Sequence, residues 1–158
     1  MDLDKRERGQ LRPLVGKKEE DQLSRNVLIW LNTFPEKPVA FIDYEYLEDN
    51  AECMALSTVP GAYITAQDIL GGYDAEYQFK VIYRILHAAK TPDRRLKADE
   101  LLDALGDWAS GQQPYIGGDM TVTSIRPATR SHLYALYENG DEDHQILMKL
   151  AYHVSATI

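Results

Sequence analysis

The sequence predicts one α+β domain in which two main helices pack on one face of a mostly antiparallel sheet of five to six strands. Three observations carry this prediction. The chain has 158 residues, about the length of one domain, and can bury a sizeable core without disulfides. Two stretches repeat apolar residues at the spacing of a helix, and five or six others alternate with the period of a strand. A ratio of two helices to five or six strands favours helices packed on one face of a sheet.

The N-terminal part is expected to be a flexible charged arm over residues 1–20, followed by a single domain over 21–158. The arm carries six basic and five acidic residues, a composition typical of a solvated tail, and docking onto a partner is the alternative. Residues 21–34 are expected to form the first helix, ended by Pro35 and Pro38. Its apolar stripe consists of Leu23, Val27, Trp30, Leu31 and Phe34.

Strand patterns follow. Alternation predicts a strand from residue 39 to 46, a short apolar run predicts a second over 53–58, and 62–66 forms a weaker third. Residues 76–86 (EYQFKVIYRIL) alternate most clearly. Residues 67–75 contain two adjacent glycines and are expected to form a loop with unusual backbone angles.

The second helix is expected after Thr91, which can cap it, with Pro92 at its first position and Gly111 ending it. Its apolar stripe consists of Ala98, Leu101, Leu102, Leu105, Trp108 and Ala109. Three strands then complete the sheet, at 120–125, 132–137 and 145–154. Asn139-Gly140 predicts a hairpin turn that pairs the last two strands antiparallel.

Composition excludes several classes of function. With 17 Lys and Arg against 25 Asp and Glu, the formal charge is −8, so a specific nucleic-acid ligand is not expected. No apolar run is long enough to span a membrane, and the first twenty residues lack the apolar stretch of a secretory signal. The lone Cys53 is expected to be a small buried side chain in a strand.

No catalytic, cofactor-binding or metal-ligating residue is predicted. His87, His132, His144 and His153 lack the spacing of a metal site, and His144 is expected in an exposed turn. The glycine pairs at 71–72 and 117–118 do not fit a phosphate-binding loop and are interpreted as turns. We therefore expect a protein that is not an enzyme and has no cofactor.

Charged groups are expected mostly in solvent. The acidic residues at 48–49 and 141–143 are interpreted as solvated turns. Arg94 and Arg95 are interpreted as the solvated face of the second helix, with an acidic protein partner as the alternative. The chain also has ten tyrosines, a residue suited to half-wet faces and protein interfaces, which favours an assembly protein.

Four strings together resemble the tail terminator proteins of long-tailed bacteriophages, a group also labelled minor capsid proteins. They are LSRNVLIWLNTF, EYQFKVIYRIL, TPDRRLKADELLDALGDWAS and HQILMKLAYHV, and the resemblance covers residues 21–154. It implies a virion structural protein of a siphovirus-like tail. The subunit would close into a hexameric ring on the tail tube, stop tube growth and offer a surface for head–tail joining.

The implied partners are other copies of the chain, the tail tube protein and a head-completion or connector protein, while DNA passes through the ring without specific binding. The implied location is the head-proximal end of the tail, after assembly in the host cytoplasm. Partner contacts are expected on Tyr73 and Asp74 of the 67–75 loop, and on Asn139, Asp141 and Asp143 of the hairpin, because polar loops on a rigid sheet commonly carry binding. Arg94 and Arg95 are further candidates.

Three alternatives remain open. The chain could be another phage neck or head–tail completion protein. It could be a monomeric acidic domain that mimics DNA or engages a basic partner. It could also be a small enzyme with a dispersed site, of which a pocket joining His87 or His132 to a carboxylate would be the sign.

Overall fold

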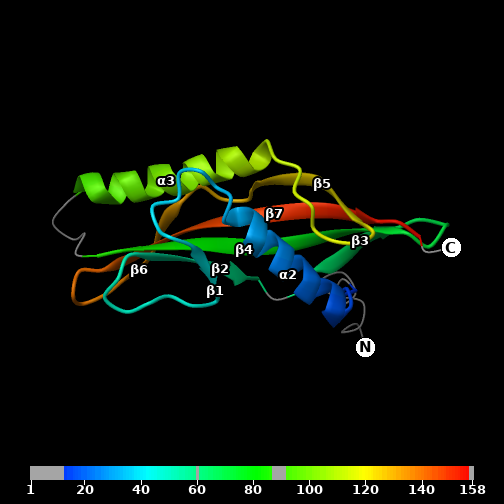
Figure 1. Cartoon of the computed structure of the whole chain (residues 1–158), viewed down its shortest axis with the longest axis horizontal. Helices are drawn as coiled ribbons and strands as arrows, with labels where there is room; N and C mark the ends of the chain where they lie inside the picture. The colour runs from blue at the N-terminus through cyan, green and yellow to red at the C-terminus, as the bar shows by residue number, and fades with distance from the viewer. Residues whose placement is uncertain (1–12, 60, 87–91, 157–158) are drawn as a thin grey trace, which may run out of the picture.

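The computed structural model describes residues 13–59, 61–86 and 92–156. Within these residues the chain forms two helices and seven strands (Figure 1). The helices are α2 (Lys17–Leu31) and α3 (Pro92–Ser110). The strands are β1 (Ile42–Tyr44), β2 (Cys53–Thr58), β3 (Tyr63–Gln67), β4 (Tyr73–Ile85), β5 (Met120–Pro127), β6 (His132–Leu136) and β7 (Glu142–Val154).

Two long central strands organise the sheet. β4 and β7 have 13 residues each and pair antiparallel along their whole length. The shorter strands extend their outer edges: β2 and β3 pair with β4, and β5 and β6 pair with β7, all antiparallel. β1 pairs parallel to β2 and is the exception. At about 3.3 Å per residue, the central strands are roughly 40 Å long, so the molecule is elongated along them (Figure 1).

Both helices cover the same face of this sheet. Ser24 of α2 shares a 2.7 Å hydrogen bond with the hydroxyl of Tyr77 on β4. α3 crosses β7 so closely that a Cβ on Gly106 would lie 3.0 Å from Ile146 Cδ1. The helices also touch each other, because the rings of Trp30 and Trp108 stack with centroids 5.1 Å apart. The α+β class with both helices on one face is thereby confirmed, with seven strands in the described residues rather than five to six.

The first helix begins four residues before its expected start. Lys17 to Glu20 belong to α2, so this part of the expected arm is helical, and residues 1–12 lie outside the described residues. Tyr152 donates to Glu19 Oε2 at 2.7 Å and the Ala62 amide donates to Glu20 Oε1 at 2.6 Å. These two carboxylates therefore fasten the first turn to the sheet.

Several element boundaries differ from the prediction for local reasons. α2 ends at Leu31 rather than 34, where the Asn32 side chain accepts from the Ile42 amide at 2.7 Å. β1 covers three residues of the expected 39–46, since Glu45 has φ 55°. The central strands begin earlier than expected, at Tyr73 and Glu142, because each continues pairing with the other. α3 matches its expected span, while its expected cap Thr91 lies outside the described residues.

Candidate functional site

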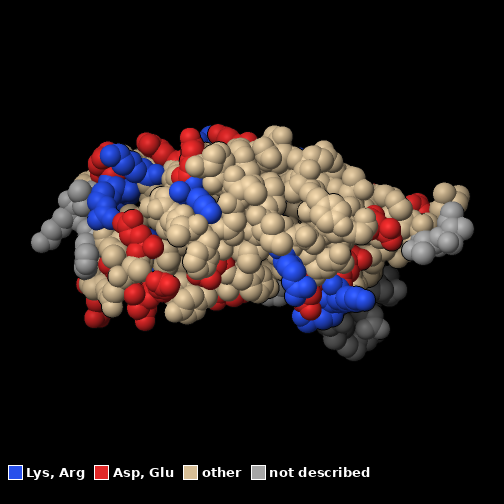
Figure 2. All heavy atoms as spheres, in the orientation of Figure 1, with Lys and Arg blue, Asp and Glu red and all other residues tan. Residues whose placement is uncertain are grey.

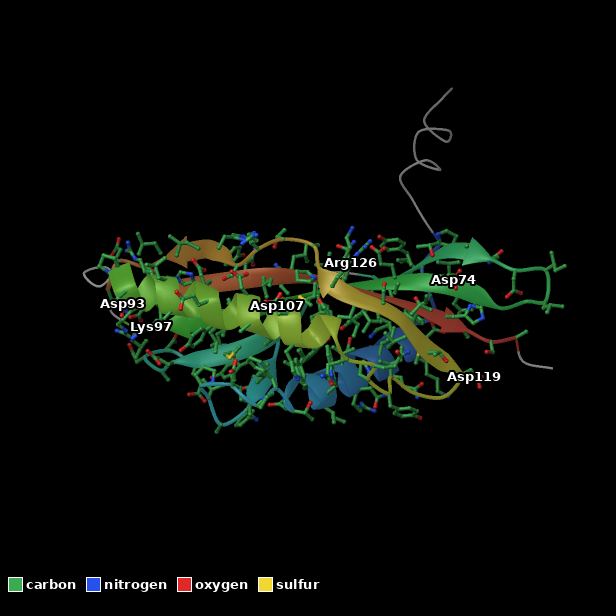
Figure 3. The ribbon with its side chains drawn as sticks, turned by 90° about the horizontal axis from the view of Figure 1, so that it is seen from above. Asp74, Asp93, Lys97, Asp107, Asp119 and Arg126 are labelled. Carbon is green, nitrogen blue, oxygen red and sulfur yellow. The ribbon has the colours of Figure 1, made fainter. Side chains whose placement is uncertain are left out.

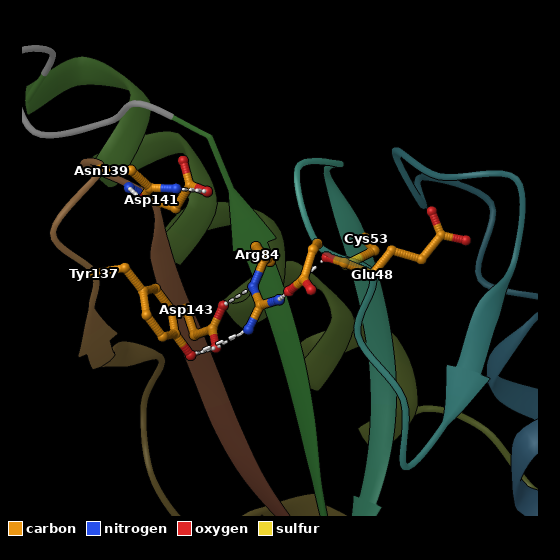
Figure 4. Close-up of polar contacts among 8 residues, drawn as sticks. Glu48, Cys53, Arg84, Tyr137, Asn139, Asp141 and Asp143 are labelled. Carbon is orange, nitrogen blue, oxygen red and sulfur yellow. Dashed lines mark hydrogen bonds and ion pairs between the residues drawn. The ribbon is translucent and has the colours of Figure 1, made fainter.

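A polar cluster lies where β4 ends and β7 begins. Arg84 Nε donates to Asp143 Oδ1 at 2.7 Å and Nη2 donates to Oδ2 at 2.9 Å (Figure 4). The two residues stand directly opposite each other on β4 and β7. Their side chains are only 12% and 3% exposed. This is a two-pronged, largely buried ion pair, the geometry in which guanidinium and carboxylate interact most strongly.

Neighbouring groups complete the cluster. Tyr137 donates to Asp143 Oδ2 at 2.7 Å and accepts from Arg84 Nη2 at 3.1 Å, while Arg84 Nη1 donates to the Glu48 carbonyl at 3.1 Å. The hydrogen bond to Asp143 raises the pKa of Arg84 and is also the main cause that raises the pKa of the Tyr137 hydroxyl. The cluster therefore joins the β6–β7 hairpin, the loop before β2 and the sheet.

The β6–β7 turn closes on itself. Asn139 Oδ1 accepts from the Asp141 amide and Asn139 Nδ2 donates to Asp141 Oδ2, both at 3.0 Å. Gly140 has φ 91°, a conformation that favours glycine. The expected hairpin turn at Asn139-Gly140 is thus present. The expected solvated run at 141–143 is wrong, since Asp141, Glu142 and Asp143 are buried.

Beside it, α3 is tied to β7 by a second set of charges. His144 is buried, with Nδ1 2.8 Å from Asp99 Oδ1 and Nε2 3.0 Å from Glu142 Oε1. Arg95 donates to Glu142 Oε2 at 2.5 Å. The prediction that His144 lies in an exposed turn is wrong, because β7 begins at Glu142 and His144 points beneath α3.

The expected solvated face of α3 is also corrected in part. Arg94 donates to Glu52 and to the Leu86 carbonyl, both at 2.5 Å, and Arg95 contacts buried Glu142. Both guanidiniums are therefore engaged within the subunit. Figure 2 shows charged side chains gathered near the start of α3 and near the start of α2, with the middle of this face mainly uncharged.

The other predicted contact segment is a protruding hairpin between β3 and β4 (Figure 1). Tyr73 and Asp74 belong to β4 and not to a loop. The Tyr73 hydroxyl donates to Glu19, and Asp74 Oδ1 lies 2.9 Å from His153 Nδ1. Burial, followed by the bond to Glu19, raises the pKa of Tyr73 to about 12. Both side chains thus have partners within the subunit.

The loop itself spans residues 68–72. Asp68 Oδ1 accepts from the Leu70 and Gly72 amides at 2.8 and 2.9 Å, so the tip is ordered by its own side chain. Ile69 is fully exposed and Leu70 is 80% exposed. Two adjacent large apolar residues at a loop tip are what a contact surface presents. An Ile-Leu pair ahead of two glycines is visible in the sequence as a signal for such a tip, but it is not among the contact residues predicted from the sequence.

Cys53 and the histidines are the side chains on which the sequence left chemistry open. Cys53 is buried, as predicted. Burial raises the pKa of its thiol, which disfavours a reactive thiolate. His132 contacts the Arg130 carbonyl and Gln145, and His87 lies outside the described residues. Among the residues that the structure covers, no group of His, Cys, Asp and Glu could hold a metal ion. No helix there is long and apolar enough to cross a membrane.

Comparisons with known proteins add little. No family model matches the chain, and no curated protein matches it. The chain is similar to a solved structure whose name states neither function nor organism, at 16% identity and a TM-score of 0.41. That match covers 91% of this chain and 99% of the other. A similarity at this level carries no argument about function.

Proposed function

We propose that the chain is a tail terminator of a long-tailed bacteriophage, a non-enzymatic subunit of a ring that caps the tail tube and receives the head connector. A terminator must bind the tube at one side and refuse another copy of the tube ring at the other, so it needs two different contact surfaces. In the virion such a ring lies at the head-proximal end of the tail.

The observation that carries the proposal is the pair of unlike apolar surfaces at the two ends of the central strands. The hairpin tip with Ile69 and Leu70 lies at one end. Edge strand β6 lies at the other, with Leu133, Tyr134 and Leu136 exposed. In Figure 1 the two elements stand at opposite ends of the molecule. One end would meet the tail tube and the other the head connector.

The charge of the chain supports the same function. At −8, a ring of subunits repels the phosphate backbone, so that DNA passes through without being gripped. Each of three arginines, Arg84, Arg94 and Arg95, forms an ion pair within the subunit, so these cations are not available to bind DNA. We place the contact with the tail tube or the head connector on Ile69 and Leu70, instead of on the partner-binding residues predicted from the sequence.

The test changes the hairpin tip. In a phage that lacks the wild-type chain, the double variant Ile69→Asp/Leu70→Asp should fold normally but fail to control tail length, as seen by negative-stain electron microscopy. Ile29→Asp is the matched control, since Ile29 is also exposed but lies on α2. Tails of normal length with the double variant would refute the contact. A chain that stays monomeric with and without tail tubes would favour a monomeric binding domain.

A further inference from the structure

One face of the sheet carries no helix among the described residues. Alternation puts Lys80 and Ile82 of β4 on this open face, with Leu147 and Lys149 of β7 beside them. Arg126 of β5 pairs with Lys149 and joins the same face. This surface is the side of the sheet opposite α2 and α3. We call these five residues the open face.

The cations of the open face lack carboxylate partners among the described residues. Arg126 and Lys149 stand directly opposite each other on neighbouring strands, an arrangement of like charges that destabilises a sheet unless an anion lies near. The contact seen for Lys80 is with a ring, its Nζ lying 5.5 Å from the Tyr134 centroid. By contrast, Arg84, Arg94 and Arg95 each contact a carboxylate. The same face also carries Asp74 and Glu76 of β4. In a chain of charge −8, three cations that have no carboxylate within ion-pair distance among the described residues favour an acidic partner.

The chain itself has an acidic surface of suitable shape. Along the side of α3 that points away from the sheet lie Asp93, Leu96, Glu100, Asp103 and Asp107, which we call the α3 stripe. Their spacings of three and four residues keep them on one line of a helix. Figure 3 labels Asp93 and Asp107 along α3, and Arg126 on β5.

Glu100 and Asp107 are the available charges of the α3 stripe. Both are exposed, and neither has an ion pair in the part of the chain that the structure describes. Asp93 contacts Lys97 at 3.1 Å and Asp103 accepts from the Ser131 amide at 2.8 Å. Leu96 is 59% exposed on the same line, so the stripe offers an apolar contact together with its charges.

We infer that the α3 stripe of one copy docks on the open face of the next copy. The charges are complementary, and Leu96 meets a face on which Leu147 is half-buried, whereas Ile82 is already buried within the subunit. The two surfaces lie on opposite sides of the same sheet, so each copy contacts one neighbour through its helix and another through its open face. Such head-to-tail contacts form a ring when the rotation between copies closes, and an open filament when it does not. The inference rests on the proposed function and supplies the lateral contact of its ring. The hairpin tip stays free for an axial partner, whereas Tyr134 of β6 borders the open face through its contact with Lys80.

Charge reversal on one surface at a time tests the docking. Arg126→Glu/Lys149→Glu and, separately, Glu100→Lys/Asp107→Lys should each weaken self-association about tenfold or more, measured by light scattering over concentration and salt. The chain that carries all four changes should regain it, because the pairing is restored with reversed sign. Lys18→Glu/Arg25→Glu is the control for Arg126→Glu/Lys149→Glu, since it makes the same change of net charge on α2, where both cations are exposed.

A covalent test gives the register. Glu100→Cys/Lys149→Cys should form a ladder of disulfide-linked oligomers under oxidation, against little background from the buried Cys53. A wild-type ring that neither single-surface reversal weakens would overturn the docking and leave the tail-terminator function standing. A wild-type chain that is monomeric alone and with tail tubes would overturn both. Binding of a fluorescent DNA duplex that Arg126→Glu/Lys149→Glu abolishes would assign the open face to nucleic acid and also overturn it.

Discussion

Removal of Asp143 should destabilise the protein strongly, because it leaves the guanidinium of Arg84 largely buried without its two-pronged partner. The Arg84 side chain is 12% exposed and that of Asp143 is 3% exposed. Breaking a buried ion pair in this way costs about 3–5 kcal/mol. We expect the lower end, about 3 kcal/mol, since Arg84 keeps the Glu48 carbonyl and the Tyr137 hydroxyl.

Urea unfolding followed by circular dichroism measures this effect. For Asp143→Ala we expect an unchanged m-value, a midpoint lower by about 1–2 M, and a Tm lower by roughly 6–12 °C. In an Arg84→Met background the same substitution should cost far less, because no buried cation is left unpaired. Asp21→Ala is the surface control and should cost about 0.5 kcal/mol or less, since Lys17 and Asp21 are 80% and 57% exposed.

The reasoning is refuted if Asp143→Ala costs under about 1 kcal/mol, or if its cost is the same in the Arg84→Met background. Either result would mean that water reaches the guanidinium and that the pair is worth no more than an exposed one. The hairpin would then owe its position to backbone pairing alone.

Two further predictions concern the core. Gly106→Ala should lower the free energy of unfolding in urea by about 1–3 kcal/mol, because the new Cβ would lie 2.9 Å from Pro127 Cγ. This steric cost should exceed the gain from alanine's preference for a helix. A stabilised variant would mean that β5 can move. The folded pKa of Tyr73 is raised to about 12 from 10, so the folded state keeps a proton that the unfolded chain loses. Stability should therefore fall as the pH rises from about 10 to 12. Tyr73→Phe should reduce that slope, and an equal slope in the variant would count against the raised pKa of Tyr73, which comes from its burial and then from its bond to Glu19.

The sequence alone predicted the fold class because each apolar pattern is local. The stripe of α3 and the alternation of β4 are visible within one element, and a helix or strand with one apolar face must bury it. The turn at Asn139-Gly140 was predictable for a similar reason, since Gly140 adopts a positive φ that favours glycine. Boundaries were less predictable, since Tyr73 belongs to β4 through its pairing with both β3 and β7.

The partners of the charged residues could be identified only from the tertiary structure. The sequence predicts a solvated acidic turn at Asp141 to Asp143, yet all three residues are buried. Arg84 reaches Asp143 and Arg95 reaches Glu142 from other elements. Those partners stand 59 and 47 residues away in the chain, and no local pattern encodes such a pairing. The Ile69 and Leu70 tip was visible in the sequence, but its exposure depends on how far the β3–β4 hairpin projects.

By itself, then, the sequence determined an acidic α+β chain with two helices on one sheet face. Apolar periodicity is a property of short segments, and net charge is a sum over the whole chain. The tertiary structure decided which charges neutralise one another and which do not. It paired Arg84 with Asp143 and set Arg126 against Lys149. Electrostatic energy depends on distance and burial, and only the register of β4, β5 and β7 fixes those two quantities.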